Sequence, residues 1–191
     1  PADGVSVVVP CYNEEDSVDQ TYQQIKKAFV SWIENGKKPL PFEIIFVNDG
    51  SSDGTEGILD KLIAGEDHLQ VLNNQTNLGY GASLKRGIAA ANYDRIIITD
   101  ADGTYPNERI PEFAEKLGDC DMLIGARIGK NTHIPLVRRP AKWLLLKYAR
   151  WMARAPIQDL NSGLRAMWKS HVERFLSLLP NGFSFTSTIT L

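Results

Sequence analysis

The sequence predicts an α/β fold built on an open, mostly parallel sheet. Apolar, β-branched runs at 5–9, 42–47 and 96–99 are typical of buried strands. An amphipathic helix over 17–33 joins the first two, and a strand, a helix and a strand in that order form a right-handed parallel unit. A cluster of polar residues directly follows each of these strands. The carboxyl ends of such strands form the ligand crevice, so the sequence predicts a binding site there.

The chain has 191 residues, of which 43% are hydrophobic, and we expect a single domain over 1–191. Its overall charge of −2 hides an asymmetry, because residues 1–121 carry a net charge of −11 and residues 122–191 a net charge of +9. The second half is therefore expected to meet an anionic partner. Two cysteines make no disulfide framework, and no run of 18 apolar residues occurs. The last residues resemble an unfinished element, so we expect the domain to continue past Leu191.

The remaining elements follow from apolar periodicity and from the positions of glycine and proline. The first helix is expected to end at Asn35-Gly36, a common helix stop. Further strands are predicted at 69–72, at 121–126 and, from its alternating pattern, at 183–189. Further helices are predicted over 56–63, from the 77–83 segment to about Ala91, over 110–117 and over 171–179.

The most informative motif follows the strand at 96–99, which ends in Asp100-Ala101-Asp102. The two carboxylates are expected at a strand tip, where a divalent cation and a phosphorylated ligand can meet. Hard oxygen ligands suit Mg²⁺ or Mn²⁺. The alternative is an Asp-rich turn that caps the next helix. D-x-D alone is common, so the neighbouring motifs decide between these two interpretations.

Two further polar clusters favour a shared ligand site. Cys11-Tyr12-Asn13-Glu14-Glu15 follows the first strand, and residues 48–55 follow the second. Taken alone, the second cluster is as typical of a well-formed loop with a helix cap. Gly79 lies at the start of a helix whose free N–H groups suit a phosphate, with Lys85 within reach. G-x-G without a third glycine is a weak dinucleotide signal.

Eight basic residues and no acidic residue occur between Met122 and Gln158. A helix over 138–155 would carry an apolar face opposite a cationic one, with Trp143 near the cationic side. Aromatic residues beside a cationic stripe are typical of a helix at an anionic lipid surface. A surface helix packed on the sheet carries about equal weight, whereas a nucleic-acid contact is weaker, and we expect no nucleic-acid partner.

Five motifs occur in order along the chain: VVVPCYNEE, VNDGSSDGT, NLGYGASLKRG, TDADG and DLNSGLRA. With them the chain resembles family 2 glycosyltransferases over nearly its whole length, most of all the branch with dolichol-phosphate mannose synthase and bacterial polyprenyl-phosphate glycosyltransferases. The resemblance implies the GT-A fold, a Rossmann-like three-layer α/β/α domain with a mostly parallel central sheet. It also implies an inverting, metal-dependent transfer of a sugar from a UDP- or GDP-linked donor to a polyprenyl phosphate.

The resemblance assigns roles to residues of this chain. Asp100 and Asp102 form the metal pair for Mg²⁺ or Mn²⁺, and Asp102 is the better candidate for direct coordination. Arg127 and Arg139 are expected to meet the acceptor phosphate, and Arg127 to act in catalysis with Asp102. Thr104 is a departure, because glutamine is common there in dolichol-phosphate mannose synthases, and it leaves the metal shell open. Together with the phosphate site at the helix start, the expected nucleotide-sugar contacts are Pro10, Tyr12, Asn13, Glu14, Asp49, Gly79, Lys85, Asp100, Ala101 and Arg165.

The chemistry depends on the leaving group, because a departing nucleoside diphosphate develops charge that a cation stabilises. A lipid phosphate is already anionic and needs no strong base, whereas a sugar hydroxyl does. Asp159 is the acid expected in that second case, and capping of its turn is at least as good an explanation. The alternatives are a glycosyltransferase with a sugar or protein hydroxyl acceptor and a non-catalytic nucleotide-sugar binding module. We expect a cytoplasmic protein, peripheral on the membrane face through 138–155, and a membrane anchor outside these residues stays an open alternative.

Overall fold

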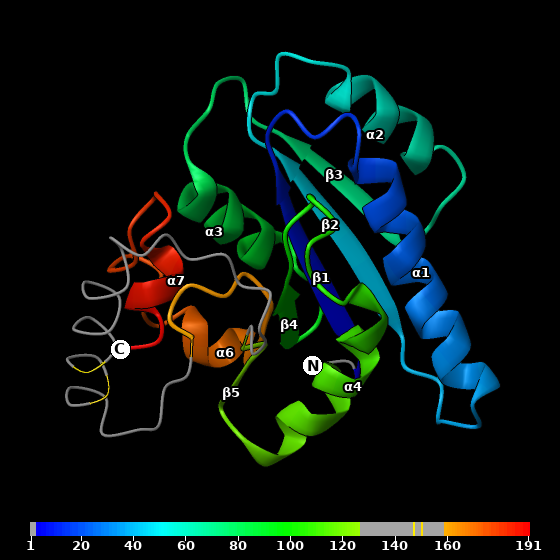
Figure 1. The fold of residues 1–191 in the computed structure, drawn as a ribbon, viewed down its shortest axis with the longest axis vertical. Coiled ribbons are helices and arrows are strands. Elements are labelled where there is room, and N and C mark those ends of the chain that lie inside the picture. Colours follow the sequence, from blue (N-terminus) through cyan, green and yellow to red (C-terminus); the bar gives the residue numbers. More distant parts are fainter. Residues whose placement is uncertain (1–2, 127–146, 148–149, 151–158) are drawn as a thin grey trace, which may run out of the picture.

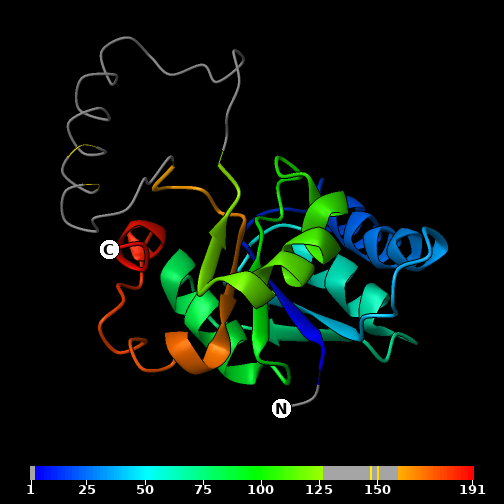
Figure 2. The same cartoon turned by 90° about the horizontal axis from the view of Figure 1, so that it is seen from below.

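The computed structural model describes residues 3–126, 147, 150 and 159–191 (Figures 1 and 2). Its strands are β1 (Val5–Cys11), β2 (Phe42–Asn48), β3 (Leu69–Asn73), β4 (Arg95–Ile98), β5 (Met122–Ile124) and β6 (Arg165–Trp168). Within this part of the chain they form one six-stranded sheet in the order β3-β2-β1-β4-β6-β5. The strands β3, β2, β1 and β4 are parallel, whereas β6 is antiparallel to both β4 and β5. The prediction of a mostly parallel sheet is confirmed.

Helices cover both faces of the sheet, as Figure 1 shows. They are α1 (Val18–Glu34), α2 (Thr55–Ile63), α3 (Tyr80–Ala90), α4 (Ile110–Lys116), α6 (Lys169–Val172) and α7 (Phe185–Thr188), with 3-10 turns η1 (Asn107–Arg109) and η2 (Leu117–Asp119). Side chains of α1, α2 and α4 join one apolar core, and side chains of α3, α6 and α7 join a second core on the opposite face. The three-layer α/β/α arrangement is therefore confirmed.

β1 occupies the centre of this arrangement and is buried along its whole length. Val7 and Val9 face the core that α1 covers, whereas Val8 faces the core that α3 covers. A continuous apolar run is what a parallel strand needs when both of its faces are covered. The strand order changes direction at β1, because β2 pairs on one side of it and β4 on the other. Open sheets of this kind bind ligands at that switch point, beyond the carboxyl ends of the strands.

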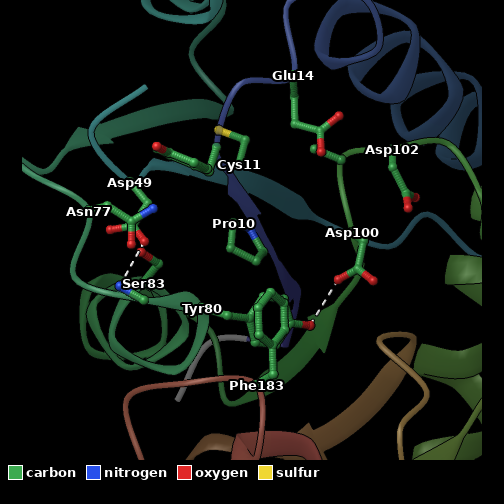
Figure 3. A pocket seen from close by; sticks show the side chains of 13 residues that line it. Pro10, Cys11, Glu14, Asp49, Asn77, Tyr80, Ser83, Asp100, Asp102 and Phe183 are labelled. Atoms are coloured by element: carbon green, nitrogen blue, oxygen red, sulfur yellow. Dashed lines mark hydrogen bonds between the residues drawn. The ribbon is translucent and has the colours of Figure 1, made fainter. Parts of the chain in front are cut away.

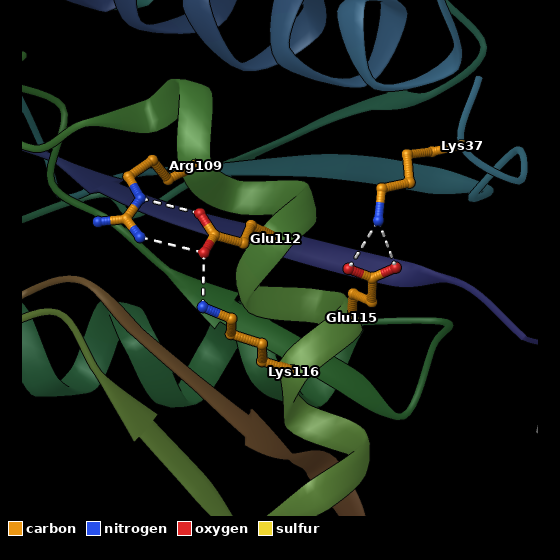
Figure 4. Close-up of polar contacts among 5 residues, drawn as sticks. All are labelled: Lys37, Arg109, Glu112, Glu115 and Lys116. Atoms are coloured by element: carbon orange, nitrogen blue, oxygen red, sulfur yellow. Dashed lines mark hydrogen bonds and ion pairs between the residues drawn. The ribbon is translucent and has the colours of Figure 1, made fainter. Parts of the chain in front are cut away.

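Ion pairs on the surface of α4 connect it to its neighbours (Figure 4). The Lys37 ammonium, just after α1, lies 3.1 Å from Glu115 Oε1. Arg109 and Lys116 both contact the Glu112 carboxylate, and these hydrogen bonds lower the pKa of Glu112 to about 2. Exposed pairs of this kind each stabilise a fold by about 1 kcal/mol or less. The Lys37 pair joins α4 to the segment after α1, whereas the two Glu112 pairs are local to α4 and the adjoining η1.

Two expectations near the C-terminal end of the chain were wrong. Residues 183–189 do not form a strand, because α7 occupies this segment. Phe185 is buried and Ile189 packs against the same core, and residues four apart share a helix face, so this spacing also fits a helix. The helix expected over 171–179 ends at Val172, and turns follow it. Within the described ranges, no helix combines the length and the apolar character needed to cross a bilayer.

Candidate active site

A pocket of about 400 Å³ opens at the carboxyl ends of β1 and β4 (Figure 3). Its wall comes from the loops after β1, β2 and β4, from the start of α3 and from the segment before α7. The lining residues are Pro10, Cys11, Tyr12, Glu14, Asp49, Asn77, Gly79, Tyr80, Ser83, Asp100, Ala101, Asp102 and Phe183. Of the residues expected to bind a nucleotide sugar, Asn13, Lys85 and Arg165 do not line this pocket. The polar strand ends that the sequence singled out therefore share one cavity.

Asn13 connects the two loops that form one side of the pocket. It adopts a left-handed backbone conformation with φ of 56°, which asparagine tolerates better than most residues. Its backbone N–H donates to Ser51 Oγ at 3.0 Å, and its Oδ1 accepts from Ser52 N at 2.8 Å. Glu15 Oε2 accepts from Gly54 N at 2.7 Å and adds a second connection. Asn13 thus holds the loops that position Tyr12 and Glu14.

Asp49 is buried directly after β2, and its carboxylate accepts hydrogen bonds from the loop between β3 and α3. Oδ1 accepts from Leu78 N at 2.9 Å and from Asn74 Nδ2 at 2.7 Å, and Oδ2 accepts from Gly79 N at 2.9 Å. A buried carboxylate requires such donors because it has lost its hydration. Asp49 therefore fixes the backbone where α3 begins, in addition to lining the pocket.

The glycines at the start of α3 allow another segment to approach closely. A Cβ on Gly79, whose φ is 98°, would lie 2.6 Å from the Asn181 carbonyl oxygen, and a Cβ on Gly81 would meet the Pro180 carbonyl oxygen. Lys85 Nζ donates to Asn181 Oδ1 at 2.9 Å. The sequence predicted a phosphate at this helix start, and that stays a prediction. The structure supplies a different reason for the glycines, namely contact with residues 180–182.

The D-x-D loop is anchored from both sides. The Ala101 carbonyl oxygen accepts from Thr21 Oγ1 on α1 at 2.8 Å. Asp102 Oδ1 accepts from the Thr104 backbone N–H at 2.9 Å and from the Thr104 hydroxyl at 2.7 Å. Asp100 Oδ1 accepts from a tyrosine hydroxyl of α3 at 2.8 Å. Thr104, the departure from the resembled pattern, therefore orients Asp102.

The aspartate pair has the chemistry that Mg²⁺ or Mn²⁺ requires. Mg²⁺ sites commonly use one or two carboxylates together with substrate phosphates and water. Asp100 and Asp102 supply two carboxylates on one wall, and Asp49 lies across the pocket from them (Figure 3). Among the residues that the structure describes, no group of three His, Cys, Asp or Glu side chains gathers around one point. Phosphate and water oxygens would have to complete the shell, as at other phosphate-bound Mg²⁺ sites.

Arg165 is the last residue of the SGLR motif and the first of β6, and its side chain lies beneath the loop formed by the preceding residues. It has no exposed surface. Its Nε donates to the Ser162 carbonyl oxygen at 2.9 Å and its Nη2 to the Leu160 carbonyl oxygen at 2.7 Å. Burial lowers the pKa of Arg165 to about 10, which leaves it charged at neutral pH. Asp159 Oδ1 accepts from Asn161 N at 3.1 Å, the geometry of a turn cap. Arg165 thus shapes the loop from below, and its predicted donor contact and the base role of Asp159 stay predictions.

Sequence reasoning missed several lining residues. Tyr80 offered a signal, because a bulky aromatic residue lies between two glycines at a helix start. Phe183 offered none, because its segment was expected to be a strand. Cys11 is an inert part of the wall: burial, with Glu14 and Asp49 nearby, raises the pKa of its thiol to about 12. It does not act as a nucleophile at neutral pH.

The acceptor-side predictions concern residues that the structure does not describe. Arg127 and Arg139 lie outside the described ranges, and so does nearly all of the basic stretch 138–155. Their expected contacts with the acceptor phosphate and with a membrane therefore stay predictions.

The chain is similar in sequence to several glycosyltransferases. It is 31% identical over 177 residues to a bactoprenol glucosyl transferase of Shigella phage SfV, covering 92% of the chain and 55% of that protein. It is 28% identical over 168 residues to an undecaprenyl-phosphate mannosyltransferase of Micrococcus luteus, covering 85% and 65%. It is 29% identical over 166 residues to a dolichyl-phosphate hexose transferase of Haloferax volcanii, covering 86% and 66%. The chain spans about half the length of the bactoprenol glucosyl transferase that it matches.

Solved structures share the fold. Glucosyl-3-phosphoglycerate synthase from Mycobacterium tuberculosis, in complex with Mn²⁺, UDP-glucose and phosphoglyceric acid, matches with a TM-score of 0.66 and 22% identity, covering 97% of this chain and 63% of that chain. Staphylococcus aureus TarS in complex with UDP-GlcNAc matches with a TM-score of 0.65 and 19% identity, covering 96% and 52%. At these identities the likeness shows the fold alone, and the predicted GT-A fold is confirmed.

The family model of glycosyl transferase family 2 matches residues 6–174, which extend from β1 to the end of α6. This range contains the polar clusters at 11–15 and 48–55, the helix start at Gly79, the D-x-D pair and the SGLR loop. The strand order and the shared pocket agree with that match. The chain belongs to glycosyl transferase family 2.

Proposed function

We propose that the chain is the catalytic domain of an inverting, metal-dependent glycosyltransferase that moves a sugar from a UDP- or GDP-linked donor to a polyprenyl phosphate. The supporting observation is that Tyr12, Asp49 and the aspartate pair Asp100 and Asp102 all line one pocket. A nucleoside diphosphate carries a planar base, for which the pocket offers the Tyr12 ring, and adjacent anionic oxygens, which a divalent cation held by the aspartate pair would neutralise. The activities named for the relatives support the lipid-phosphate acceptor, and the Mn²⁺ and UDP-glucose complex of a structural neighbour supports the donor and the ion.

The residues of this pocket have separate tasks in that reaction. Tyr12 is 47% exposed at the rim, so its ring is available to stack on the nucleoside base. Asp49 fixes the loop that closes the same end of the pocket. Asp100 and Asp102 would hold the divalent cation, which neutralises the charge that develops on the departing diphosphate.

The transfer is a single displacement. An oxygen of the acceptor phosphate bonds to the anomeric carbon as the bond from that carbon to the diphosphate breaks, and attack from the opposite side inverts the centre. The acceptor oxygen is already anionic, so no side chain has to remove a proton. The surroundings of Asp159 agree with this, because its carboxylate is buried and accepts from the Asn161 backbone N–H rather than serving as an exposed base. Arg127 and Arg139 would bind the acceptor phosphate, and the basic stretch 138–155 would meet the cytoplasmic face of the membrane.

A transfer assay tests this proposal. The purified chain is incubated with radiolabelled UDP-glucose or GDP-mannose, Mn²⁺ and undecaprenyl phosphate in detergent, and the label is extracted into organic solvent. We expect label in the organic phase with the wild type and a loss of orders of magnitude in Asp102→Asn. A water-soluble product alone would refute the lipid-phosphate acceptor. Donor binding without turnover of any acceptor would indicate a non-catalytic binding module.

A further inference from the structure

Tyr80 separates the pocket from a second cavity. It lines the active-site pocket and also an adjoining cavity of about 410 Å³, and Asp100 and Phe183 line both as well. The Tyr80 and Phe183 rings stack with centroids 5.5 Å apart and an interplanar angle of 19°. Figure 3 shows the two rings overlapping, with the Tyr80 hydroxyl directed at Asp100. Two aromatic rings and one carboxylate therefore form the partition.

The position of Tyr80 is fixed by its backbone. It is the first residue of α3, and the preceding Gly79 N–H donates to Asp49 Oδ2 at 2.9 Å. Two residues later, Ala82 N donates to the Asn181 carbonyl oxygen at 3.0 Å. The helix start is thus held from two sides, and one rigid path leads from Asp49 to Tyr80 and on to Asp100. A shift of Tyr80 would therefore also shift the Asp100 carboxylate that its hydroxyl contacts.

The hydroxyl of Tyr80 donates to Asp100 Oδ1 at 2.8 Å. A phenol carries its proton at physiological pH, so the Tyr80 hydroxyl is the donor in this bond. A hydrogen bond to a charged acceptor is stronger than one between neutral groups. It limits rotation of the carboxylate, in the same way that the Thr104 hydroxyl limits rotation of Asp102. Each carboxylate of the pair therefore has a hydroxyl donor on its Oδ1.

We propose that Tyr80 is a positioning residue that orients the Asp100 carboxylate toward the divalent cation. This inference rests on the proposed metal-dependent function. Donors that orient metal ligands typically change metal affinity or activity by roughly 10-fold to 100-fold when they are removed. The competing explanation is packing alone, since the Tyr80 ring also stacks on Phe183. The Tyr80→Phe variant separates the two, because it keeps the ring and removes the hydroxyl.

The test measures Mn²⁺ dependence in wild type and Tyr80→Phe. We expect the Mn²⁺ concentration for half-maximal transfer, and the Kd of Mn²⁺ measured by calorimetry with UDP present, to rise roughly 10-fold to 100-fold. The kcat at saturating Mn²⁺ should change far less. Tyr22→Phe is the matched control, because it also removes a hydroxyl from a buried ring, 3.4 Å from His68 Nε2 and on α1. Its Mn²⁺ dependence should equal that of the wild type.

The outcomes separate this inference from the proposed function. A wild type that binds no Mn²⁺ with UDP present would overturn the metal-dependent function itself. A wild type that binds Mn²⁺ with the same Kd as folded Tyr80→Phe would overturn the positioning role alone. If Tyr80→Phe does not fold, 3-fluorotyrosine at position 80 keeps the hydroxyl and provides a fluorine NMR signal. That signal should shift when Mg²⁺ and UDP are added together, and an unchanged signal would overturn the inference.

Discussion

Replacing Gly163 with alanine is expected to disable the aspartate pair while the fold persists. A Cβ at this position would lie 2.7 Å from both Cγ and Oδ1 of Asp100. Carbon atoms pack at about 3.5 to 4.0 Å, so one of the two groups has to move by about 1 Å. The carboxylate can move by rotation of the Asp100 side chain, whereas the loop can move only by a shift of its backbone. The loop is held by the hydrogen bond from Gly163 N to the Tyr105 hydroxyl at 2.6 Å.

The cost to stability follows from the bond that is lost. Turning Asp100 away breaks its hydrogen bond with Tyr80, and a bond to a charged group contributes about 1.5–3 kcal/mol. Loss of this bond should therefore lower the free energy of unfolding by about 1.5–3 kcal/mol. Misplacing a catalytic group by about 1 Å can reduce the rate roughly 100-fold. The expected result is therefore a protein that still folds and transfers sugar roughly 100-fold more slowly.

The assay is the transfer reaction at several Mn²⁺ concentrations, run beside thermal unfolding of the same samples. Gly57→Ala on α2 is the matched control, because a Cβ there meets no atom within 4 Å. It should leave activity unchanged and stabilise the helix by about 0.5–1 kcal/mol. Wild-type activity and Mn²⁺ dependence in Gly163→Ala would refute the reasoning, because the orientation of Asp100 would then have no bearing on function.

Three further predictions follow from the structure. Thr104→Ala should raise the Mn²⁺ concentration needed for half-maximal transfer roughly 10-fold, because Asp102 loses its hydroxyl donor. Thr104→Ser keeps a hydroxyl and should need the same Mn²⁺ concentration as the wild type. Equal Mn²⁺ requirements in the two variants would contradict this. Arg165→Met should lower the free energy of unfolding in urea by roughly 2–6 kcal/mol, because two buried loop carbonyls lose their donor, and an unchanged midpoint would contradict this. Burial lowers the pKa of His68, although Glu66 opposes the shift, so below pH 6.5 the unfolded state binds more protons than the folded state. Stability should be lost as the pH falls below 6.5, and the melting temperature of His68→Gln should fall less than that of the wild type between about pH 7.5 and 5.5.

Local signals in the sequence were sufficient for the parallel sheet and for one side of the pocket. β1 and β2 are continuous apolar runs that end in polar clusters, and this pattern identifies buried parallel strands and their ligand-facing ends. Asp100 and Asp102 were identifiable for the same reason, because they directly follow such a strand. Each of these features depends on neighbours in the chain.

Features that depend on distant contacts were not predictable. Phe183 stacks on Tyr80 from more than one hundred residues away, and no local pattern encodes that pairing. The same limit explains Arg165, which resembles a ligand-binding cation in its motif but is buried beneath its own loop. The segment of α7 is short, and its spacing of apolar residues fits a strand and a helix equally well. Tertiary packing decided between them.

Donor binding must require both a divalent cation and Asp102 if the aspartate pair holds a metal bound to the diphosphate. Thermal unfolding of the wild type and of Asp102→Asn with UDP-glucose or GDP-mannose, with and without Mn²⁺, measures this directly, because a ligand of the folded state raises its apparent stability. We predict that at least one donor raises the melting temperature of the wild type only when Mn²⁺ is present, and that Asp102→Asn abolishes this rise. An equal rise without Mn²⁺, or an undiminished rise in Asp102→Asn, would contradict it.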